Sequence, residues 1–271
     1  MASPRKILVT GANQGIGLAL VKRLVTEKGC FVYLGARDAA KGEAAKASLG
    51  PAAADAVQVV PIDVTKNDTI QALKQQFQAD GVKLYALVNN AGVGFASPGD
   101  TIDINYHGLK RVTDALVDFV EARIVNVSSG AASMWLRNQD AATQALFSDP
   151  DSIQALDAAV AKFAPTTDFL YGLSKAANTA VTVAYAKQYP HLQVVSLSPG
   201  YVETRMTADF GDNKITPEQG TTSLMKCLFE DVTSGWYYGS DGLRSPLTGT
   251  RDPGTPEYQG EANPDPAKYN K

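Results

Sequence analysis

The sequence predicts an α/β fold: a doubly wound parallel sheet of about seven strands with helices on both faces. Short β-branched apolar runs alternate with longer amphipathic stretches, and the first run leads directly into a glycine-rich turn. Strands that alternate with helices form βαβ units, whose parallel strands are covered on both faces. The predicted strands are 7–10, 31–35, 57–62, 84–89, 123–128, 194–198 and 236–238, and the predicted helices are 16–28, 38–49, 66–79, 101–121, 171–188 and 217–230.

Composition narrows the class of protein. The 271 residues are 44% hydrophobic and carry a net charge of −3, so we expect one domain over 1–271 and neither nucleic acid nor an anionic membrane as partner. No segment reaches the roughly 18 apolar residues of a membrane span. The two cysteines, Cys30 and Cys227, match no metal spacing, and as small buried hydrophobes they suit a reducing compartment. We expect a cytoplasmic protein without a metal site.

Two regions break the alternation. Residues 130–169 are too long for a simple connection, and their apolar positions have helical spacing, so we expect a helical insertion there. Residues 240–271 are rich in Gly, Pro and polar residues without a sustained period, which predicts an irregular C-terminal tail.

The turn after the first strand predicts a phosphate site. Gly11, Gly15 and Gly17 stand between an apolar strand and an amphipathic helix, with the spacing Gly-x-x-x-Gly-x-Gly. Glycines permit a tight turn and a close approach of backbone to phosphate, and the helix N-terminus attracts the negative charge. We therefore expect a Rossmann-like dinucleotide site.

The end of the second strand bears on the choice of dinucleotide. Arg37 stands directly after the strand, where a guanidinium can pair with a 2′-phosphate, which favours NADP. Asp38 keeps the choice open, because its carboxylate is either the N-cap of the next helix or a ligand of the ribose.

Tyr171 and Lys175 lie one helical turn apart. A tyrosine with a cation at this distance is expected to have a lowered pKa, which lets it exchange a proton with a carbonyl oxygen near neutral pH. In many helices a tyrosine and a lysine at this spacing are only a packed aromatic ring beside a solvated cation. The pair by itself therefore does not predict a catalytic role.

With these motifs in order along the chain, the sequence resembles the short-chain dehydrogenase/reductase family over almost all of its length. The resemblance implies a catalytic set of Asn105, Ser129, Tyr171 and Lys175. In it Tyr171 is the general acid, Ser129 a donor to the substrate oxygen, and Asn105 the holder of a water that connects Lys175 to solvent. The cofactor positions implied are Gly11, Asn13, Gln14, Gly15, Ile16, Gly17, Arg37, Asp63, Val64, Asn89, Ala91, Gly92, Tyr171, Lys175, Pro199, Gly200, Val202 and Thr204.

The long interval between Ser129 and Tyr171 is similar to that of the carbonyl reductase branch, whose members use NADPH and are mostly monomers. Those reductases often carry a basic residue where Gln14 stands. We therefore expect NADPH/NADP+ as cofactor, a small ketone or aldehyde as substrate, and a monomer. The alternatives are a non-catalytic NADP(H) sensor on the same fold, or an alcohol dehydrogenase that works mainly in the oxidative direction.

The substrate side is predicted less sharply. Trp135, Phe95 and Tyr201 follow strand ends, so each either walls an apolar pocket or packs in the core. The insertion 130–169 is expected to wall one side of the pocket, and residues 205–216 to close another.

Overall fold

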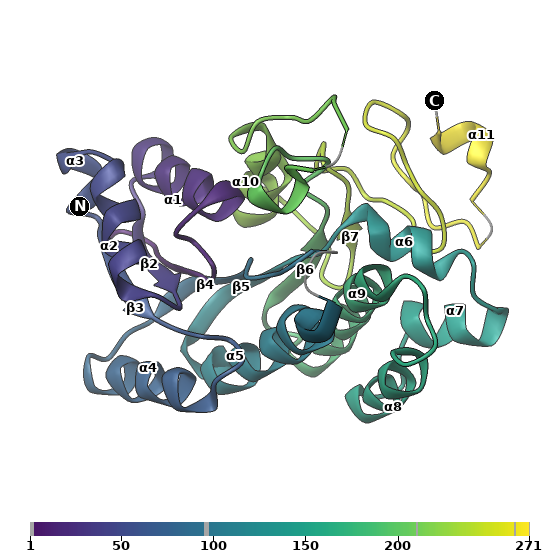
Figure 1. The fold of residues 1–271 in the computed structure, drawn as a ribbon, viewed down its shortest axis with the longest axis horizontal. Coiled ribbons are helices and arrows are strands. Elements are labelled where there is room, and N and C mark those ends of the chain that lie inside the picture. Colours follow the sequence, from purple (N-terminus) through teal and green to yellow (C-terminus); the bar gives the residue numbers. More distant parts are fainter. Residues whose placement is uncertain (1–2, 95–97, 210, 263, 271) are drawn as a thin grey trace.

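We describe the protein from a computed structural model that covers residues 3–94, 98–209, 211–262 and 264–270. In this part of the chain seven strands form one parallel sheet in the order β3-β2-β1-β4-β5-β6-β7. The predicted doubly wound sheet is therefore confirmed (Figure 1). The strands are β1 (Lys6–Val9), β2 (Phe31–Ala36), β3 (Val57–Pro61), β4 (Leu84–Asn89), β5 (Val120–Val127), β6 (Gln193–Leu197) and β7 (Tyr237–Tyr238).

Helices cover both faces of the sheet (Figure 1). One face carries α1 (Gly15–Lys28), α2 (Ala39–Ser48) and α10 (Thr222–Phe229), and the other carries α4 (Asn67–Ala79), α5 (Leu109–Leu116) and α9 (Leu170–Gln188). A short helix, α3 (Pro51–Ala54), precedes β3.

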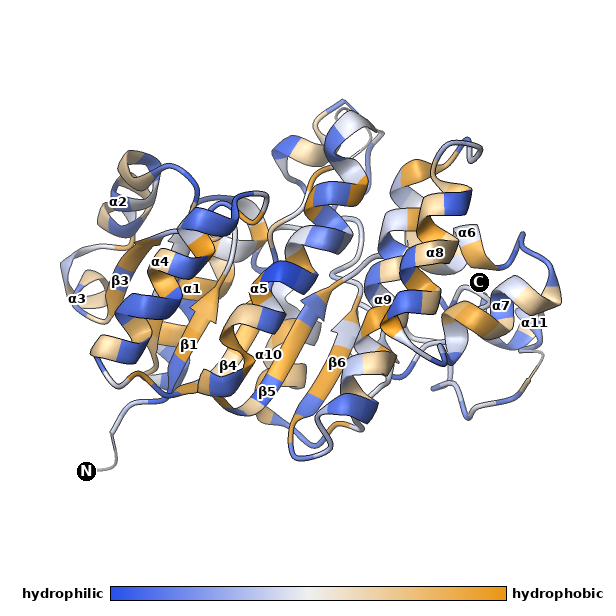
Figure 2. Cartoon of the chain, turned by 90° about the horizontal axis from the view of Figure 1, so that it is seen from below, coloured by the Kyte–Doolittle hydropathy of each residue, from blue (hydrophilic) through white to orange (hydrophobic). Residues whose placement is uncertain are grey.

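Alternation along the strands divides the apolar core into two layers. In β1, Leu8 belongs to the core under α4, α5 and α9, whereas Ile7 and Val9 belong to the core under α1 and α10. Successive side chains of a strand point to opposite faces, so an unbroken apolar run supplies both layers. Figure 2 shows the result: apolar residues gather along the strands, and hydrophilic residues lie on the outer helix surfaces.

The predicted helix 101–121 is wrong at its C-terminal end. A π-helical segment, η2 (Asp103–Gly108), leads into α5, and a 3₁₀ turn, η3 (Val117–Phe119), ends the helical run. Val120 is already in β5, paired with Leu84 of β4. Strand pairing with β4 therefore overrides the helical period, a tertiary effect that a local pattern does not contain.

Residues 130–169 hold three helices, α6 (Gly130–Leu136), α7 (Ala141–Ser148) and α8 (Ile153–Phe163), all of which contact α9. Asp157 of α8 accepts hydrogen bonds from Tyr106 (2.7 Å) and Lys110 (2.5 Å), which ties α8 to the segment η2–α5. The three helices thus lie against α9, and α8 also reaches the helix before β5.

Residues 240–262 and 264–265 are irregular, and the short helix α11 (Pro266–Tyr269) follows them. Arg251 is buried and forms a salt bridge with Asp241, and its Nη1 donates to the Thr255 carbonyl at 3.0 Å. Ser133 of α6 donates to the Pro246 carbonyl at 3.0 Å. These contacts hold the tail against α6, on the side of the molecule where the insertion lies (Figure 1).

Candidate active site

The residues singled out from the sequence gather at the carboxyl edge of the sheet, where the parallel strands all end. Gly11 follows β1, Arg37 follows β2, Asp63 follows β3, Ser129 follows β5 and Pro199 follows β6. Ligands of open α/β sheets bind at this edge. Motifs that are far apart along the chain are therefore brought together at one edge of the sheet.

The glycine turn is packed so closely that side chains are excluded from it. A Cβ on Gly11 would lie 2.8 Å from Ala91 Cα, and one on Gly17 would lie 2.6 Å from the Asn90 amide nitrogen. Gly11 and Gly15 also have φ of +62° and +54°, a region that favours glycine. Gln14 is the N-cap of α1, but its side chain makes no capping hydrogen bond, so the helix N-terminus is open to an anion.

Asn13 and Ile16 complete the turn. Asn13 lies between the two positive-φ glycines, and Ile16 stands in the first turn of α1, where it packs against the core under α1 and α10. Their contribution to a cofactor would come through the backbone of the turn.

Two residues that brace this turn, Thr10 and Asn90, were not among the site positions predicted from the sequence. Thr10 Oγ1 accepts hydrogen bonds from the backbone of Asn90 and Ala91, each at 3.0 Å. The Asn90 side chain donates to the carbonyl of Thr10 (2.9 Å) and to that of Gly11 (3.1 Å). The signal was present, since Asn90 stands between the predicted cofactor positions Asn89 and Ala91 in the sequence Asn-Asn-Ala-Gly (89–92), but spacing alone does not say what each asparagine does.

Asn89 proves to be a structural brace. Its amide nitrogen donates to Thr113 Oγ1 at 3.0 Å and to Asn126 Oδ1 at 2.8 Å, and the side chain is buried. Its side chain therefore ties β4 to α5 and β5.

At the end of β2, Asp38 accepts a hydrogen bond from the Lys41 backbone N–H at 3.1 Å and is the N-cap of α2. The N-cap alternative for Asp38 is confirmed, and Arg37 beside it is exposed. Burial would raise the pKa of Asp63, but hydrogen bonds from Thr65 outweigh it and lower the pKa, so Asp63 is ionised at neutral pH. Val64 is largely buried, and a Cβ on Gly108 would lie only 2.7 Å from its side chain.

Asn105 and Lys175 meet at Gly92. A Cβ there would lie 3.1 Å from Asn105 Oδ1 and 3.4 Å from Lys175 Nζ. Asn105 is buried in the π-helical segment η2, a type of irregularity that is frequent at functional sites. Its side chain accepts from the Val93 N–H (2.9 Å) and donates to Val93 O (2.9 Å) and Ser174 Oγ (3.0 Å). The amide thus fixes the loop after β4 to α9.

Lys175 lies in α9 and is buried, with Nζ donating to the Val127 carbonyl of β5 at 2.9 Å. Nζ lies 5.8 Å from the centre of the Tyr171 ring. Burial lowers the pKa of Lys175 from 10.5 to about 8, because an ammonium is poorly stabilised away from water.

The expected lowering of the Tyr171 pKa is not what this structure shows. Burial raises the pKa of Tyr171, and a hydrogen bond with Ser129 acts in the opposite direction without reversing the increase. Ser129, the N-cap of α6, also accepts from the Ala131 N–H at 3.2 Å.

Close packing of α6 against α9 brings Ser129 and Tyr171 together. A Cβ on Gly172 would lie 2.8 Å from Trp135 Cβ and 2.6 Å from the Phe169 ring. Gly172 therefore lets the two helices approach each other next to Ser129 and Tyr171.

Trp135 is a core residue, so the pocket-wall alternative for it is wrong. Its ring packs against Phe147 (5.1 Å between centroids) and Phe163 (5.6 Å), and its indole N–H donates to Thr167 Oγ1 at 3.1 Å. The side chain is only 3% exposed. The insertion supplies these partners, Phe147 from α7, Phe163 from α8 and Thr167 from the segment after α8, and their placement is not visible in a local pattern.

The segment after β6 closes over the site from the other side. Pro199 and Gly200 (φ +90°) turn the chain, and the buried Val202 pairs with Ile215. The methyl group of Thr204 would lie 3.4 Å from a Cβ on Gly15, so this segment reaches the glycine turn.

Met206 is a further residue that sequence reasoning missed. Its sulfur lies 4.0 Å from the Tyr171 hydroxyl, and its Cγ would be 2.5 Å from a Cβ on Gly94. Only its position within the segment 205–216, predicted to close the pocket, gave a signal. Tyr201 is 42% exposed and its hydroxyl donates to Gly211 O at 3.3 Å, while Phe95 lies outside the described residues.

Ser198 and Tyr237 connect the start of α6 with the turn after β6. Ser198 Oγ accepts hydrogen bonds from the N–H groups of Gly130 (3.2 Å) and Gly200 (3.3 Å), and it is hydrogen-bonded with the buried Tyr237 of β7. One hydroxyl thus connects the residue after Ser129 with the turn after β6.

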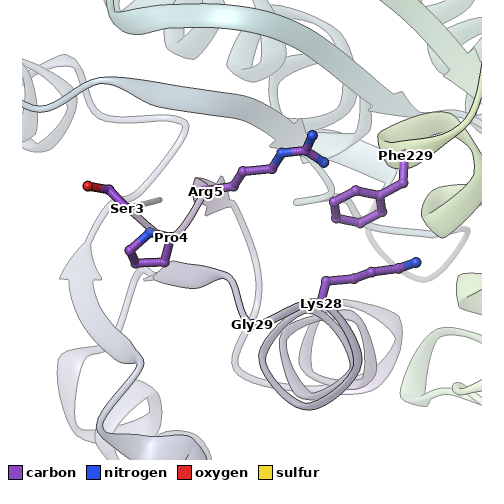
Figure 3. A pocket seen from close by; sticks show the side chains of 6 residues that line it. All are labelled: Ser3, Pro4, Arg5, Lys28, Gly29 and Phe229. Carbon is purple, nitrogen blue, oxygen red and sulfur yellow. The ribbon is translucent and has the colours of Figure 1, made fainter. Parts of the chain in front are cut away.

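A surface depression of about 450 Å³ lies elsewhere, lined by Ser3, Pro4, Arg5, Lys28, Gly29 and Phe229 (Figure 3). It is at the start of β1 and the end of α1, the opposite edge of the sheet from Tyr171. The carbonyl end of α1 disfavours an anion there, and none of the candidate catalytic residues lines it.

Two classes of site are absent from the described part of the chain. No group of three or more His, Cys, Asp or Glu side chains could hold a metal ion. No helix combines the length and the apolar character needed to cross a bilayer.

Comparison with known proteins yields one family. The family model described as short chain dehydrogenase matches residues 5–141. Carbonyl reductase (NADPH) 3 of Rattus norvegicus is 30% identical over 262 residues, covering 84% of this chain and 93% of the relative. Salutaridine reductase of Papaver somniferum is 29% identical over 300 residues, covering 88% and 95%. The solved structure of salutaridine reductase from Papaver somniferum superimposes with a TM-score of 0.78 at 26% identity and covers 86% of this chain and 99% of that one.

Proposed function

Because the chain belongs to the short chain dehydrogenase family, we propose that it reduces a ketone or aldehyde with NADPH and that Tyr171 is the general acid. One observation carries the proposal: Tyr171 is hydrogen-bonded with Ser129 at the edge of the sheet that also holds the glycine turn, with Lys175 5.8 Å from the Tyr171 ring. A phosphate cradle beside an acid and its hydrogen-bond partner suits hydride transfer coupled to proton transfer.

The residues present fit a dinucleotide. Gly11 and Gly17 leave no room for side chains in the turn, and the N-terminus of α1 has neither a capping side chain nor an acidic residue in its first turn. The cofactor would supply the hydride. Arg37, exposed at the end of β2, supports NADPH, because the Asp38 carboxylate beside it is engaged at its helix N-terminus.

The protein's own part is orientation and the movement of one proton. The Ser129 hydroxyl donates to the substrate oxygen, which positions it and stabilises the negative charge that develops there. Tyr171 donates its phenolic proton to the same oxygen, and protonated Lys175 favours the phenolate that forms. Asn105 holds the loop after β4, from which a water would connect Lys175 to solvent.

The alternatives remain a non-catalytic NADP(H) sensor and an alcohol dehydrogenase that acts mainly in the oxidative direction. The sensor is disfavoured because cofactor binding does not require an acid hydrogen-bonded with Ser129. Direction follows the cofactor ratio and the substrate, which are not properties of the chain.

A monomer is also part of the proposal. Helices α6, α7 and α8 all contact α9, and the bond between Asp157 and Lys110 carries α8 onto α5. Covering these two helices removes the self-complementary face that a two-fold dimer through them would need. Light scattering should give the mass of one 28.7 kDa chain, and twice that mass would reject the covering role.

The two buried free cysteines, Cys30 and Cys227, are the basis for proposing a cytoplasmic location.

The direct test is loss of the reduced-nicotinamide absorbance with a panel of aromatic ketones, quinones, aliphatic aldehydes and ketoesters. Turnover with NADPH supports the reductase. Tight NADPH binding without turnover of any carbonyl, or of any alcohol with NADP+, would instead support the sensor.

A further inference from the structure

Arg205 is not among the site positions predicted from the sequence. It directly follows Thr204, and its Nη1 lies 3.5 Å from the side-chain oxygen of Gln14. Gln14 is the N-cap of α1, so this guanidinium reaches across from the segment after β6 to the mouth of the glycine turn.

The position of Arg205 is defined by its neighbours. Thr204 and Thr207 form a reciprocal pair of hydrogen bonds around the 3₁₀ turn Arg205–Thr207, and Thr207 Oγ1 also donates to Val202 O at 2.7 Å. The Thr204 methyl group would lie 3.4 Å from a Cβ on Gly15. Arg205 therefore lies on a turn that contacts the glycine turn after β1.

The charge of Arg205 has no carboxylate partner among the described residues, whereas Arg23, Arg111 and Arg251 each form a salt bridge. Within the described residues its one hydrogen bond goes to a neutral amide and is long, while a guanidinium offers five donors. The Arg205 guanidinium also lies beside the N-terminus of α1, which is the positive end of the helix dipole. A cation is disfavoured there unless an anion lies between it and the helix.

We propose that Arg205 binds the diphosphate of the dinucleotide and supplies the positive charge that the glycine turn, with Gln14, lacks. The proposal rests on the proposed cofactor. We assign the diphosphate because Arg205 lies at Gln14 and its neighbour Thr204 lies over Gly15, both at the helix N-terminus that attracts phosphate. Arg37 stands at the end of a different strand, β2, and is left for the 2′-phosphate.

The assignment connects the cofactor with the substrate side. Met206, the next residue, lies 4.0 Å from the Tyr171 hydroxyl. A diphosphate that holds Arg205 therefore also holds Met206 over the proton donor. Cofactor binding would then order the turn Arg205–Thr207, which lies over Tyr171, before the carbonyl substrate enters.

The test compares Arg205→Ala, Arg205→Lys and the control Lys214→Ala, using calorimetric titration with NADPH and with NADH. Lys214 is a second cation of the same segment, with Nζ facing Ala208 O at 3.4 Å, so its removal changes the net charge equally. Arg205→Ala should raise Kd for both cofactors by a similar factor, roughly 10- to 100-fold for a lost charge-assisted contact. Arg205→Lys should lie between, and Lys214→Ala should stay within about twofold of the parent.

Hydrogen exchange gives a second readout that is independent of turnover. NADPH should slow exchange in residues 204–209 of the parent and of Lys214→Ala, and much less in Arg205→Ala. Equal Kd values for Arg205→Ala and Lys214→Ala would overturn the proposal, and a loss confined to NADPH would overturn the diphosphate assignment. A parent that binds neither cofactor would refute the proposed function itself, before any variant is compared.

Discussion

The glycine turn after β1 and the substrate side of the same edge differ in what holds them in place. The turn is fixed by close backbone packing, since Gly11 lies against Ala91, and by the Asn90 side chain, which donates to the carbonyls of Thr10 and Gly11. The substrate side is assembled from separate segments, namely the insertion 130–169, the turn after β6 and the tail.

On the substrate side the fixing contacts are made by side chains and join distant parts of the chain. Ser133 of α6 bonds Pro246 in the tail, Asp157 of α8 bonds Lys110 in α5, and Met206 lies against Tyr171. Side chains of the insertion and the tail can therefore be changed without altering the contacts of the glycine turn. The difference predicts that substitutions in the helices of the insertion leave the glycine turn intact, whereas the turn Arg205–Thr207 lies near both Gln14 and Tyr171.

The largest effect is expected at Tyr171. Tyr171→Phe keeps the ring but removes the transferable proton, so hydride transfer should slow by roughly 10²–10⁴-fold while the Kd of NADPH stays unchanged. Single-turnover measurements with bound NADPH check this. A rate within a few-fold of the parent would mean that Tyr171 is not the acid.

Trp135→Ala tests whether the insertion is packed as part of the hydrophobic core or is a loosely attached flap. The side chain is 3% exposed and packs on Phe147 and Phe163, so its removal should cost about 3–5 kcal/mol of unfolding free energy. The matched control is the neighbouring Met134→Ala, because Met134 is 43% exposed. Urea unfolding should show a small loss for the control, and equal losses would contradict the core position of Trp135.

Lys175→Met tests the burial of the lysine through pH. Folded Lys175 has a pKa of about 8 against 10.5 in the unfolded chain, so between these values the unfolded chain binds more protons. The burial cost, about 3 kcal/mol, is therefore present in full below pH 8 and is relieved as the pH rises toward 10.5.

The variant lacks that cost. Its stability relative to the parent should thus be greatest near neutral pH and should decline above pH 8. Denaturant unfolding of both proteins over this range measures the difference. A difference that does not change with pH would show that Lys175 titrates normally.

Arg37→Ala tests the cofactor side alone. A lost contact with the 2′-phosphate should weaken NADPH by about 1.5–3 kcal/mol and leave NADH nearly unchanged. Lys41→Ala, a cation one turn further along α2, is the matched control. Calorimetry with both cofactors decides, since an equal loss for both would remove Arg37 from the phosphate site.

The fold could be predicted from sequence wherever it depends on local pattern. Strand β4 (Leu84–Asn89) has the predicted bounds, because an unbroken apolar run between two helical stretches is distinctive. The helix before β5 was predicted too long, because Val120 joins the sheet through its pairing with Leu84. The glycine turn, the exposed Arg37 and the pair Tyr171–Lys175 were all visible in order along the chain.

The sequence by itself determined the parallel sheet and the gathering of polar residues at its carboxyl edge, since parallel strands place all their ends on one side. Only the tertiary structure decided that Asn89 is a brace, that Trp135 is core, and that Arg205 meets Gln14. It also decided the direction of the Tyr171 pKa, which burial raises. The physical reason is the same in each case: burial and contact depend on residues far apart in the chain, whereas local spacing records only which face of an element a side chain occupies.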